Sequence, residues 1–520
     1  MEQNPTRQAI LAKANGHDLF VSPSVMPLLE ARFDFELFLE KMIIVAKDKK
    51  AMSLNVSIFN QVLEEFERLK GEASKVEEAA NVENLAEKNG DLKVEVLRTD
   101  YKPVSRDIES DLQISIRDSD VTGKSRCKGK VEDFVTYFND RFSKMKKILR
   151  QVSANDNPLK SIREAKAAKG QSKIIAIVNE KRPTKNGHLI IEVEDEEEYT
   201  VVLVGKDSPL MEEAQNTYLD EIIAIDVFNN GNLLIAKNFT KPGRILQEQT
   251  RKKGELDVSV AFMSDLHVGS RFFEKEKFEN FIAFLNGKSA SEGDKLLAGN
   301  IKYLAVAGDC SDGIGIYPSQ EKELVIKDIY KQYEVMFDYL KQIPDYIEII
   351  VTPGNHDAVR GGDPQPQLTD DLAKWAKGFK NIHLAGSPSV HKIHNFDLLM
   401  YHGTSSDALI SNNIALKDGY LFPQKIGIEM LRRRHLMPIY GEDPMIPENK
   451  DYLLIDEKPD IFHFGHVHKN GYAVFQGTQI INSGTWQGQT DFQVKHGHIP
   501  TPGLLPIYNL KTLELTSKQF

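Results

Sequence analysis

Residues 257–267 read DVSVAFMSDLH, an apolar run that ends in an aspartate and a histidine one residue apart. The run predicts a buried β-strand, and the alternation of side chains along a strand places Asp265 and His267 on one side at its carboxyl end. An isolated Asp-x-His sequence is weak evidence of a metal site. The strands that follow decide whether this pair belongs to a larger set.

Four further apolar runs are followed by polar residues in the same way. The runs are IKYLAVA, YIEIIVTP, FDLLM and DIFHF, and the polar residues after them are Asp309, Asn355, His356, Asp357, His402, His466 and His468. In open α/β sheets, ligands gather at the carboxyl ends of the strands. A histidine taken alone is more often a structural residue, but an ordered series of five strand ends predicts one common metal site.

The predicted ligands suit two divalent cations that share one anionic ligand, and Asp309 is the natural bridge. We expect one cation to be bound by Asp265, His267, Asp309 and His468, and the other by Asp309, Asn355, His402 and His466. A set of oxygen and imidazole ligands without sulfur favours Mn²⁺ or iron, with Zn²⁺ as a further candidate. His402 is preferred over its neighbouring histidines because it follows a predicted strand and precedes Gly403.

The residue types also predict the chemistry of the site. Two metals lower the pKa of a bound water toward neutrality and hold a phosphate for in-line attack. His356, beside the ligand Asn355, is expected to protonate the leaving oxygen or to stabilise the transition state. Asp357 is expected to orient that imidazole, and Asp312 is either a second supporting carboxylate or a turn residue.

The composition limits the class of protein. The 520 residues are 27% charged and 41% hydrophobic, which is ordinary for folded proteins, and the formal net charge of −10 argues against nucleic-acid binding through bulk charge. No apolar run reaches the roughly 18 residues of a membrane helix. The two cysteines suit a reducing compartment. We therefore expect an intracellular, cytoplasmic protein without a membrane partner.

Changes of pattern along the chain predict four parts. Residues 1–70 carry apolar residues at helical spacing and are expected to form a helical N-terminal domain, either a tethered protein-binding module or a small bundle with no special role. Residues 71–130 are acidic and nearly without aromatics, which is typical of a flexible linker. Residues 131–250 and 255–520 are expected to fold.

The third part begins with an amphipathic helix, VEDFVTYFNDRFSKMKKILR, whose basic face we interpret as solvated, with phosphate contact as the alternative. Five short strands with Asn-Gly turns follow between Lys173 and Phe239, and a helical stretch lies near Met211 to Tyr218. This pattern suits a β-barrel of the OB-fold type. The fourth part alternates apolar strands with helices, as an α/β domain does.

The order of the motifs resembles that of the calcineurin-like metallophosphoesterase superfamily over residues 256–520. Three longer stretches, GDCSDGIGIYPSQ, FGHVHKNGY and NSGTWQGQTDFQ, make the chain similar to the small subunits of archaeal family D DNA polymerases. The resemblance implies a multidomain α+β protein: a calcineurin-like domain, built as a two-layered β-sandwich flanked by helices, preceded by an OB-fold barrel and a small helical domain.

The resemblance also implies a function, a proofreading 3′→5′ exonuclease subunit with two metal ions, in a heterodimer with a large catalytic polymerase subunit. The expected partners are DNA 3′ ends and, through the holoenzyme, the sliding clamp. The expected location is the nucleoid. One alternative is a phosphomonoesterase or cyclic phosphodiesterase of the same superfamily, and another is a structural polymerase subunit without chemistry. His496 and His498 are expected in a loop, with DNA contact as the alternative.

Overall fold

The computed structural model divides into two compact units, residues 1–97 and residues 98–520. It describes residues 20–21, 25, 42, 53–54, 59, 101–153, 157–231, 233–244, 250–289 and 291–520. In the first unit, two short parallel strands are described, β1 (Phe20–Val21) and β2 (Ser53–Leu54). The predicted helical domain of residues 1–70 otherwise lies outside the described residues, as does the predicted linker up to residue 100.

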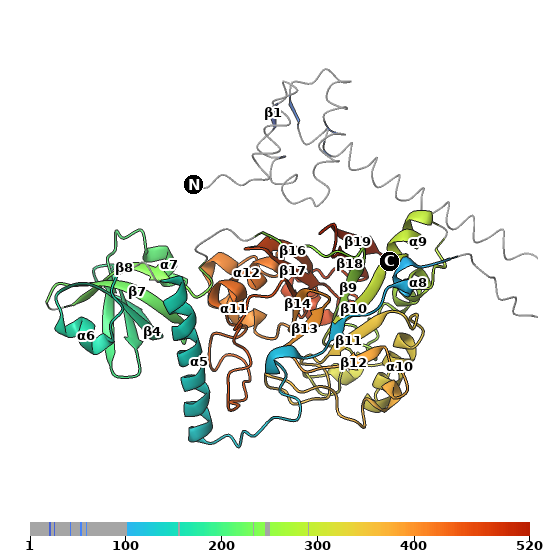
Figure 1. The fold of residues 1–520 in the computed structure, drawn as a ribbon, viewed down its shortest axis with the longest axis horizontal. Coiled ribbons are helices and arrows are strands. Elements are labelled where there is room, and N and C mark those ends of the chain that lie inside the picture. The colour runs from blue at the N-terminus through green and yellow to red at the C-terminus, as the bar shows by residue number, and fades with distance from the viewer. Residues whose placement is uncertain are drawn as a thin grey trace, which may run out of the picture. The chain divides into compact units, whose positions relative to one another are not determined.

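Two six-stranded sheets form the core of the second unit (Figure 1). The first has the order β12-β11-β10-β9-β18-β19, and its strands are β9 (Ser259–Met263), β10 (Ile301–Ala307), β11 (Glu348–Thr352), β12 (Ile382–Leu384), β18 (Leu504–Asn509) and β19 (Leu515–Gln519). Strands β9 to β12 are parallel, and β18 and β19 run antiparallel to their neighbours. The parallel strands β9 and β10 are buried along their whole length, which explains their continuous apolar sequences.

The second sheet has the order β16-β17-β15-β14-β13-β3. Its strands are β3 (Leu112–Gln113), β13 (Ser389–Ile393), β14 (Phe396–Met400), β15 (Ile461–Phe464), β16 (Asn470–Phe475) and β17 (Thr478–Ser483). Strands β14, β15 and β17 are parallel to one another. The inner faces of the two sheets share one apolar cluster, in which Phe262 and Ile350 of the first sheet join Leu398 and Ile481 of the second.

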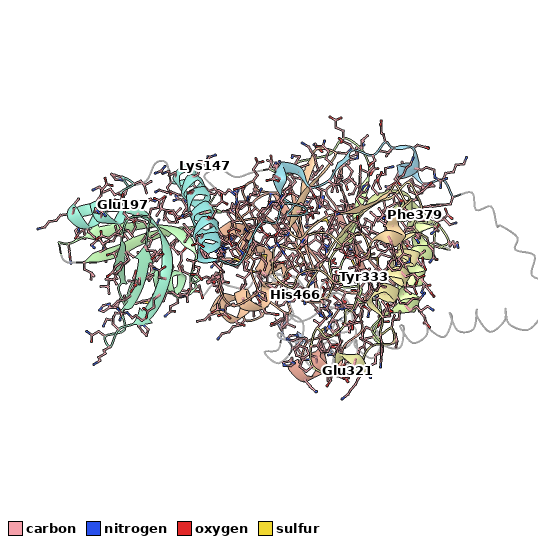
Figure 2. The ribbon with its side chains drawn as sticks, turned by 90° about the horizontal axis from the view of Figure 1, so that it is seen from below. Lys147, Glu197, Glu321, Tyr333, Phe379 and His466 are labelled. Atoms are coloured by element: carbon pink, nitrogen blue, oxygen red, sulfur yellow. The ribbon has the colours of Figure 1, made fainter. Side chains whose placement is uncertain are left out.

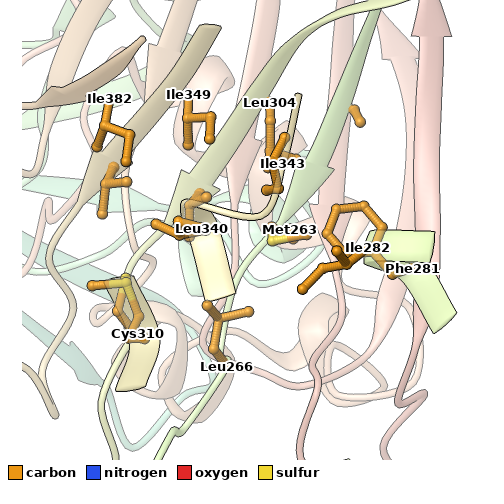
Figure 3. Packing of buried hydrophobic residues seen from close by; sticks show 14 of the residues in the cluster. Met263, Leu266, Phe281, Ile282, Leu304, Cys310, Leu340, Ile343, Ile349 and Ile382 are labelled. Atoms are coloured by element: carbon orange, nitrogen blue, oxygen red, sulfur yellow. The ribbon is translucent and has the colours of Figure 1, made fainter. Parts of the chain in front are cut away.

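Helices cover the outer faces of both sheets. Against the first lie α8 (Lys275–Leu285), α9 (Glu292–Gly299) and α10 (Ile329–Leu340), and against the second lie α11 (Ser406–Ser411) and α12 (Gln424–Arg433). Figure 3 shows Met263, Leu304 and Ile349 of the first sheet beside Phe281 and Leu340 of its helices. This arrangement is the two-layered sandwich flanked by helices that the resemblance implies.

Helix α10 illustrates how the local sequence forms these layers. Asp328 caps its first turn by accepting a hydrogen bond from the backbone N–H of Lys331. Tyr333, Met336 and Leu340 then recur at helical spacing and are buried against the sheet. The remaining short elements of this domain are α13 (Asp491–His496) and the 3₁₀ helices η1 (Val104–Asp107), η2 (Ile116–Asp118), η3 (Gln320–Lys322), η4 (Lys374–Ala376) and η5 (Ile414–Leu416).

Five strands between residues 170 and 240 close into a barrel, as the sequence predicts. They are β4 (Gly170–Pro183), β5 (Leu189–Glu194), β6 (Tyr199–Val204), β7 (Ile222–Asn229) and β8 (Leu234–Thr240), in the closed order β4-β5-β6-β8-β7. Helix α6 (Ile162–Ala167) precedes the barrel, and α7 (Met211–Gln215) lies between β6 and β7. Inward-facing Val, Ile and Leu side chains fill the interior.

The predicted amphipathic helix is α5 (Val131–Val152), which packs between the barrel and the sandwich domain. Its apolar face, including Phe142 and Leu149, contacts Ile175 of the barrel and Leu454 of the sandwich domain. Within the described ranges, none of the helices combines the length and the apolar character that a membrane span requires.

The linker prediction is wrong for residues 101–130, which pack on the sandwich domain. Strand β3 pairs with β13 at the edge of the second sheet, Ser105 donates a hydrogen bond to the carbonyl of Ile301 at 2.9 Å, and Val121 is buried. The segment has few apolar residues because it needs no core of its own: an existing sheet edge supplies its backbone partners. A prediction of disorder from composition does not detect a segment that is ordered by pairing with another part of the chain.

Candidate metal centre

The loops after five strands bring the predicted ligands together. These strands are β9, β10 and β11 of the first sheet and β14 and β15 of the second, so the site joins the two halves of the sandwich. The first two loops bind each other directly: the N–H of Asp265 donates to the carbonyl of Gly308 at 2.9 Å, and the N–H of His267 donates to that of Asp309 at 3.0 Å. Figure 2 labels His466, on the loop after β15, and Tyr333, on α10, in opposite halves.

The backbone at the site adopts a conformation that ordinary residues rarely take. Positive φ angles of 51° to 71° occur at Asp265, His267, Asp309, His466 and His468. Left-handed backbone costs a non-glycine residue of order 1–3 kcal/mol and is concentrated at functional sites. Its recurrence at five predicted ligands indicates that the fold holds these side chains in place at the expense of local stability.

The first group of donor atoms surrounds the imidazole of His267. Its Nε2 lies 3.0 Å from His468 Nε2, 4.0 Å from Asp265 Oδ1 and 3.7 Å from Asp309 Oδ2. His468 Nε2 lies 3.3 Å from Asp265 Oδ1. All four side chains are buried. These are the four residues that the sequence assigns to one cation.

The second group surrounds the amide oxygen of Asn355. This oxygen lies 2.9 Å from His402 Nε2 and 3.1 Å from His466 Nδ1. His402 Nε2 lies 3.3 Å from Asp309 Oδ2, the same carboxylate oxygen that faces His267. Asp309 is therefore the residue that connects both groups, as expected for a bridging ligand.

The spacing and chemistry of these atoms fit two divalent cations. Ligands bound at about 2.0–2.2 Å to one ion lie roughly 3 Å apart, close to the observed separations. The donors are carboxylate, amide and imidazole, and three overlapping groups of them lie within a metal-binding distance: Asp265 with His267 and His468, His267 with Asp309 and His356, and Asp265 with Asp309 and His402. The residues present could therefore hold two metal ions.

Two glycines permit the close approach of these loops. A Cβ atom on Gly354 would collide with the Asp309 carboxylate, and one on Gly465 would collide with that of Asp265. Both glycines directly precede a predicted ligand. The sequence motifs Gly-Asn-His-Asp and Gly-His-x-His thus combine a ligand with the space that the neighbouring ligand needs.

Each imidazole of the predicted ligand set is held by a hydrogen bond to its other nitrogen. His267 Nδ1 lies 3.0 Å from Asp312 Oδ1, and His402 Nδ1 lies 2.9 Å from the carbonyl oxygen of Ala307. The two histidines of the Gly-His-x-His motif have partners on helices: His466 Nε2 lies 3.2 Å from Asp407 Oδ2 on α11, and His468 Nδ1 lies 2.8 Å from the Gln493 amide on α13. Such partners fix the ring orientation of metal ligands.

Sequence reasoning missed Asp407 and Gln493. Asp407 belongs to none of the quoted motifs, Gln493 is only the last residue of the stretch NSGTWQGQTDFQ, and each lies on a six-residue helix. The capping box of α13, in which Thr490 and Gln493 exchange hydrogen bonds, is the one local signal nearby. That signal predicts a helix start and no link to a metal ligand.

The sequence predicts that Asp357 orients the imidazole of His356, but the two side chains have different partners. The Asp312 carbonyl oxygen, 2.8 Å from His356 Nδ1, orients the imidazole. The Asp357 carboxylate instead accepts hydrogen bonds from the Tyr333 hydroxyl and from three backbone N–H groups, those of Cys310, Ser311 and Gly354. The prediction that Asp357 orients His356 is therefore wrong, because its side chain points into the loops that it ties together.

Charges within the site shift several pKa values. Burial alone would lower the pKa of His402, but the carboxylates of Asp309 and Asp265 raise it to about 10. The pKa of His267 is raised in the same way, against the effect of burial, by Asp312 and Asp309. Burial raises the pKa of carboxyl groups in general, yet His402 and His356 hold that of Asp309 well below its usual range. At neutral pH the site without metals thus pairs a carboxylate with a protonated imidazole.

A cavity of about 480 Å³ opens above the metal-ligand cluster. Its floor includes His267, Asp309, Asn355 and the two histidines of the Gly-His-x-His motif, and His356 lies beside them. Its walls carry rings, from Tyr317, Tyr420, Phe492, His496 and His498. A phosphoester that enters this cavity would meet both donor groups and His356 together.

The chain is similar to several known proteins. Residues 258–470 match the family model of calcineurin-like phosphoesterases. A protein of Methanocaldococcus jannaschii named DNA polymerase II small subunit is 41% identical over 421 residues, which are 80% of this chain and 70% of that protein. One with the same name from Methanothermobacter thermautotrophicus is 38% identical, over 76% of this chain and 81% of that protein. A solved archaeal phosphodiesterase is 15% identical with a TM-score of 0.26, over 51% of this chain and all of that chain.

Proposed function

This chain belongs to the family of DNA polymerase II small subunits, and from that premise we propose that it is the proofreading 3′→5′ exonuclease of a family D DNA polymerase. The observation that carries the proposal is the position of Asp309, whose one carboxylate oxygen faces both donor groups at the floor of an open cavity. A phosphoesterase domain within a polymerase subunit has an evident substrate in the DNA that the polymerase extends.

The residues support hydrolysis of a phosphodiester. Two divalent ions, proposed to be Mn²⁺, supply when bound the positive charge that stabilises the transition state and the acidity that activates water. Asp265, His267 and His468 would hold one ion, Asn355, His402 and His466 would hold the other, and Asp309 would be available to both. The contact of His356 Nδ1 with the Asp312 carbonyl leaves Nε2 as the nitrogen that meets the substrate. Burial lowers the pKa of His356 against the opposing effect of Asp309, and in its protonated form the imidazole would donate a proton from Nε2 to the leaving 3′ oxygen.

The proposal includes the surroundings of the enzyme. We propose a heterodimer with a large catalytic subunit, binding of DNA 3′ ends, contact with a sliding clamp through the holoenzyme, and a place in the cytoplasm at the nucleoid. We also propose that residues 131–250 form an OB-fold domain with its leading helix. The strand order of the barrel, β4-β5-β6-β8-β7, supports the OB-fold. So does the position of α7, which lies in the chain between the third strand, β6, and the fourth, β7.

The test is digestion of a labelled primer with a mismatched 3′ end, with Mn²⁺ or with EDTA, by the full chain and by His356→Ala. We expect Mn²⁺-dependent release of 3′ nucleotides that is lost in the variant. Equal activity of the two proteins, or none with any metal even beside the large subunit, contradicts the proposal. Turnover of small nitrophenyl esters while DNA is ignored would favour a phosphomonoesterase instead.

A further inference from the structure

One wall of the cavity carries a row of four rings. The ring centroids of Phe492 and His496 lie 4.1 Å apart with an interplanar angle of 34°, and those of Tyr420 and His498 lie 4.2 Å apart at 30°. The two pairs meet where His496 and His498 lie 6.2 Å apart. All four residues line the cavity. Two stacked pairs of rings therefore line the same cavity as the predicted metal ligands.

Hydrogen bonds fix this row relative to both donor groups. At one end the Tyr420 hydroxyl donates to Asp407, whose other oxygen lies 3.2 Å from His466 Nε2. At the other end Gln493, which lies between the two rings of α13 in sequence, contacts His468 Nδ1 at 2.8 Å. The distance from the rings to the metals is thus set by side chains that also orient the ligands. A molecule stacked on the row would place its phosphate at a defined position.

The charges around the cavity point to rings, and not to cations, as the means of recognition. Among the described residues that line the cavity, none is a lysine or an arginine. Proteins that bind single strands combine a positively charged groove with aromatic side chains on which bases stack, and the lining of this cavity supplies the aromatic part. Stacking on a ring needs a base whose face is free, which a paired end within a duplex does not offer. The cavity therefore suits an unpaired end better than a duplex.

We infer that the row Tyr420, His498, His496 and Phe492 stacks the bases of unpaired nucleotides at a DNA 3′ end and so selects single-stranded or frayed ends for hydrolysis. The inference rests on the proposed exonuclease function and names the residues that determine its substrate. Stacking of the terminal bases sets the register of the chain, so that the last phosphodiester lies over Asp309. A paired end must first separate before its bases can reach the row.

The test compares Phe492→Ala with a matched control, Val494→Ala. Both residues lie on α13 and are exposed to a similar degree, 57% and 59%, so neither truncation should unfold the protein. Only Phe492 lines the cavity. The full chain, with its large subunit if activity requires it, is assayed in Mn²⁺ on a single-stranded oligonucleotide and on the same oligonucleotide with abasic residues at its 3′ end. Phe492→Tyr tests rescue by another ring.

We expect Phe492→Ala to raise KM for the ordinary oligonucleotide by about tenfold, with a much smaller change in kcat, because one stacking contact is lost. On the abasic end the wild-type protein should already show the higher KM, and Phe492→Ala should add nothing. Phe492→Tyr and Val494→Ala should resemble the wild type.

Equal loss on both substrates, or an unchanged KM on the ordinary one, overturns the inference while leaving the exonuclease proposal in place. A wild-type protein that digests no DNA under any of these conditions overturns both.

Discussion

Two regions of this protein bury aspartate and histidine side chains together, but their geometry differs. In the metal centre, Asp309 and Asp265 face the ring nitrogens of His267, His402 and His468. Beneath α5, by contrast, Asp451 accepts hydrogen bonds from the Tyr137 hydroxyl at 2.8 Å and from Arg141 Nε at 2.6 Å, and lies 2.7 Å from His435 Nε2. We call the second region the α5 anchor.

The difference is in how the carboxylate charge is balanced. In the α5 anchor a buried guanidinium supplies a permanent positive charge, and the donors occupy both carboxylate oxygens of Asp451. In the candidate metal centre the carboxylates of Asp265 and Asp309 accept backbone N–H groups and face titratable imidazoles, whose nitrogens converge on common points. In this protein the buried Asp-His contacts of the α5 anchor thus include a permanent cation, and those of the candidate metal centre do not.

The strongest test of this distinction is Asp309→Asn. We expect hydrolysis to fall by at least about 10³-fold, because one neutral amide cannot bridge two cations. Metal content measured on the purified variant should drop, and its unfolding midpoint without metal should fall as well, because protonated His402 loses the buried carboxylate that it pairs with. A variant that retains both metals and its activity would show that Asp309 is not the bridge.

In the α5 anchor, Asp451→Asn should act on stability instead of chemistry. Removing the carboxylate leaves the Arg141 guanidinium buried and unpaired, which typically costs about 3–5 kcal/mol of unfolding free energy. Denaturant unfolding should show this loss, and metal binding should be unchanged. The double variant Arg141→Met with Asp451→Asn, which removes the unpaired charge, serves as the control and should recover part of the loss.

A smaller effect is expected for Asp407→Asn, which alters the partner of His466 without touching the bridge. Loss of such a partner typically weakens metal binding by about 10- to 100-fold. Titration of the metal-free protein with Mn²⁺ should detect the change for one of the two ions. An exposed carboxylate that does not line the cavity, Asp418, offers a control: Asp418→Asn should leave both affinities as they are.

The smallest effect concerns pH and again separates the two regions. The pKa of His402 is about 10 without metal, so Mn²⁺ must displace a proton, and affinity should rise about tenfold per pH unit between pH 6.5 and 9. The same proton stabilises the metal-free fold fully below pH 6.5, and this stability is lost as pH rises through about 10. The difference in Tm with and without Mn²⁺ should therefore widen with pH.

The α5 anchor should not respond in that range. Burial would raise the pKa of Asp451, but Arg141 and His435 hold it far below its usual value. Its contribution to stability is present above about pH 4 and is lost only in acid.

A protein whose metal-dependent Tm shift is the same at pH 6.5 and pH 9 would contradict the assignment of His402 as a ligand.

The sequence alone predicted the five strand ends, the ligand set and the five-stranded barrel. These features can be predicted from local sequence. In any open α/β sheet, an apolar strand followed by a glycine and a polar residue indicates a ligand at the carboxyl end of that strand. Asp309 and the Gly-His-x-His motif could be assigned without knowing which strands are neighbours. The same local reasoning failed for residues 101–130, whose order depends on the edge of a sheet formed more than 250 residues later.

Only the tertiary structure decided which side chains support the ligands. Asp407 and Gln493 reach His466 and His468 from helices, and no local pattern links either residue to its histidine. Asp357 lies beside His356 in sequence but contacts other groups. The sequence by itself thus determined the chemistry of the ligands, because residue type and strand position suffice for it. The tertiary structure decided their orientation and the ring-lined entrance, because both depend on packing between segments far apart in the chain.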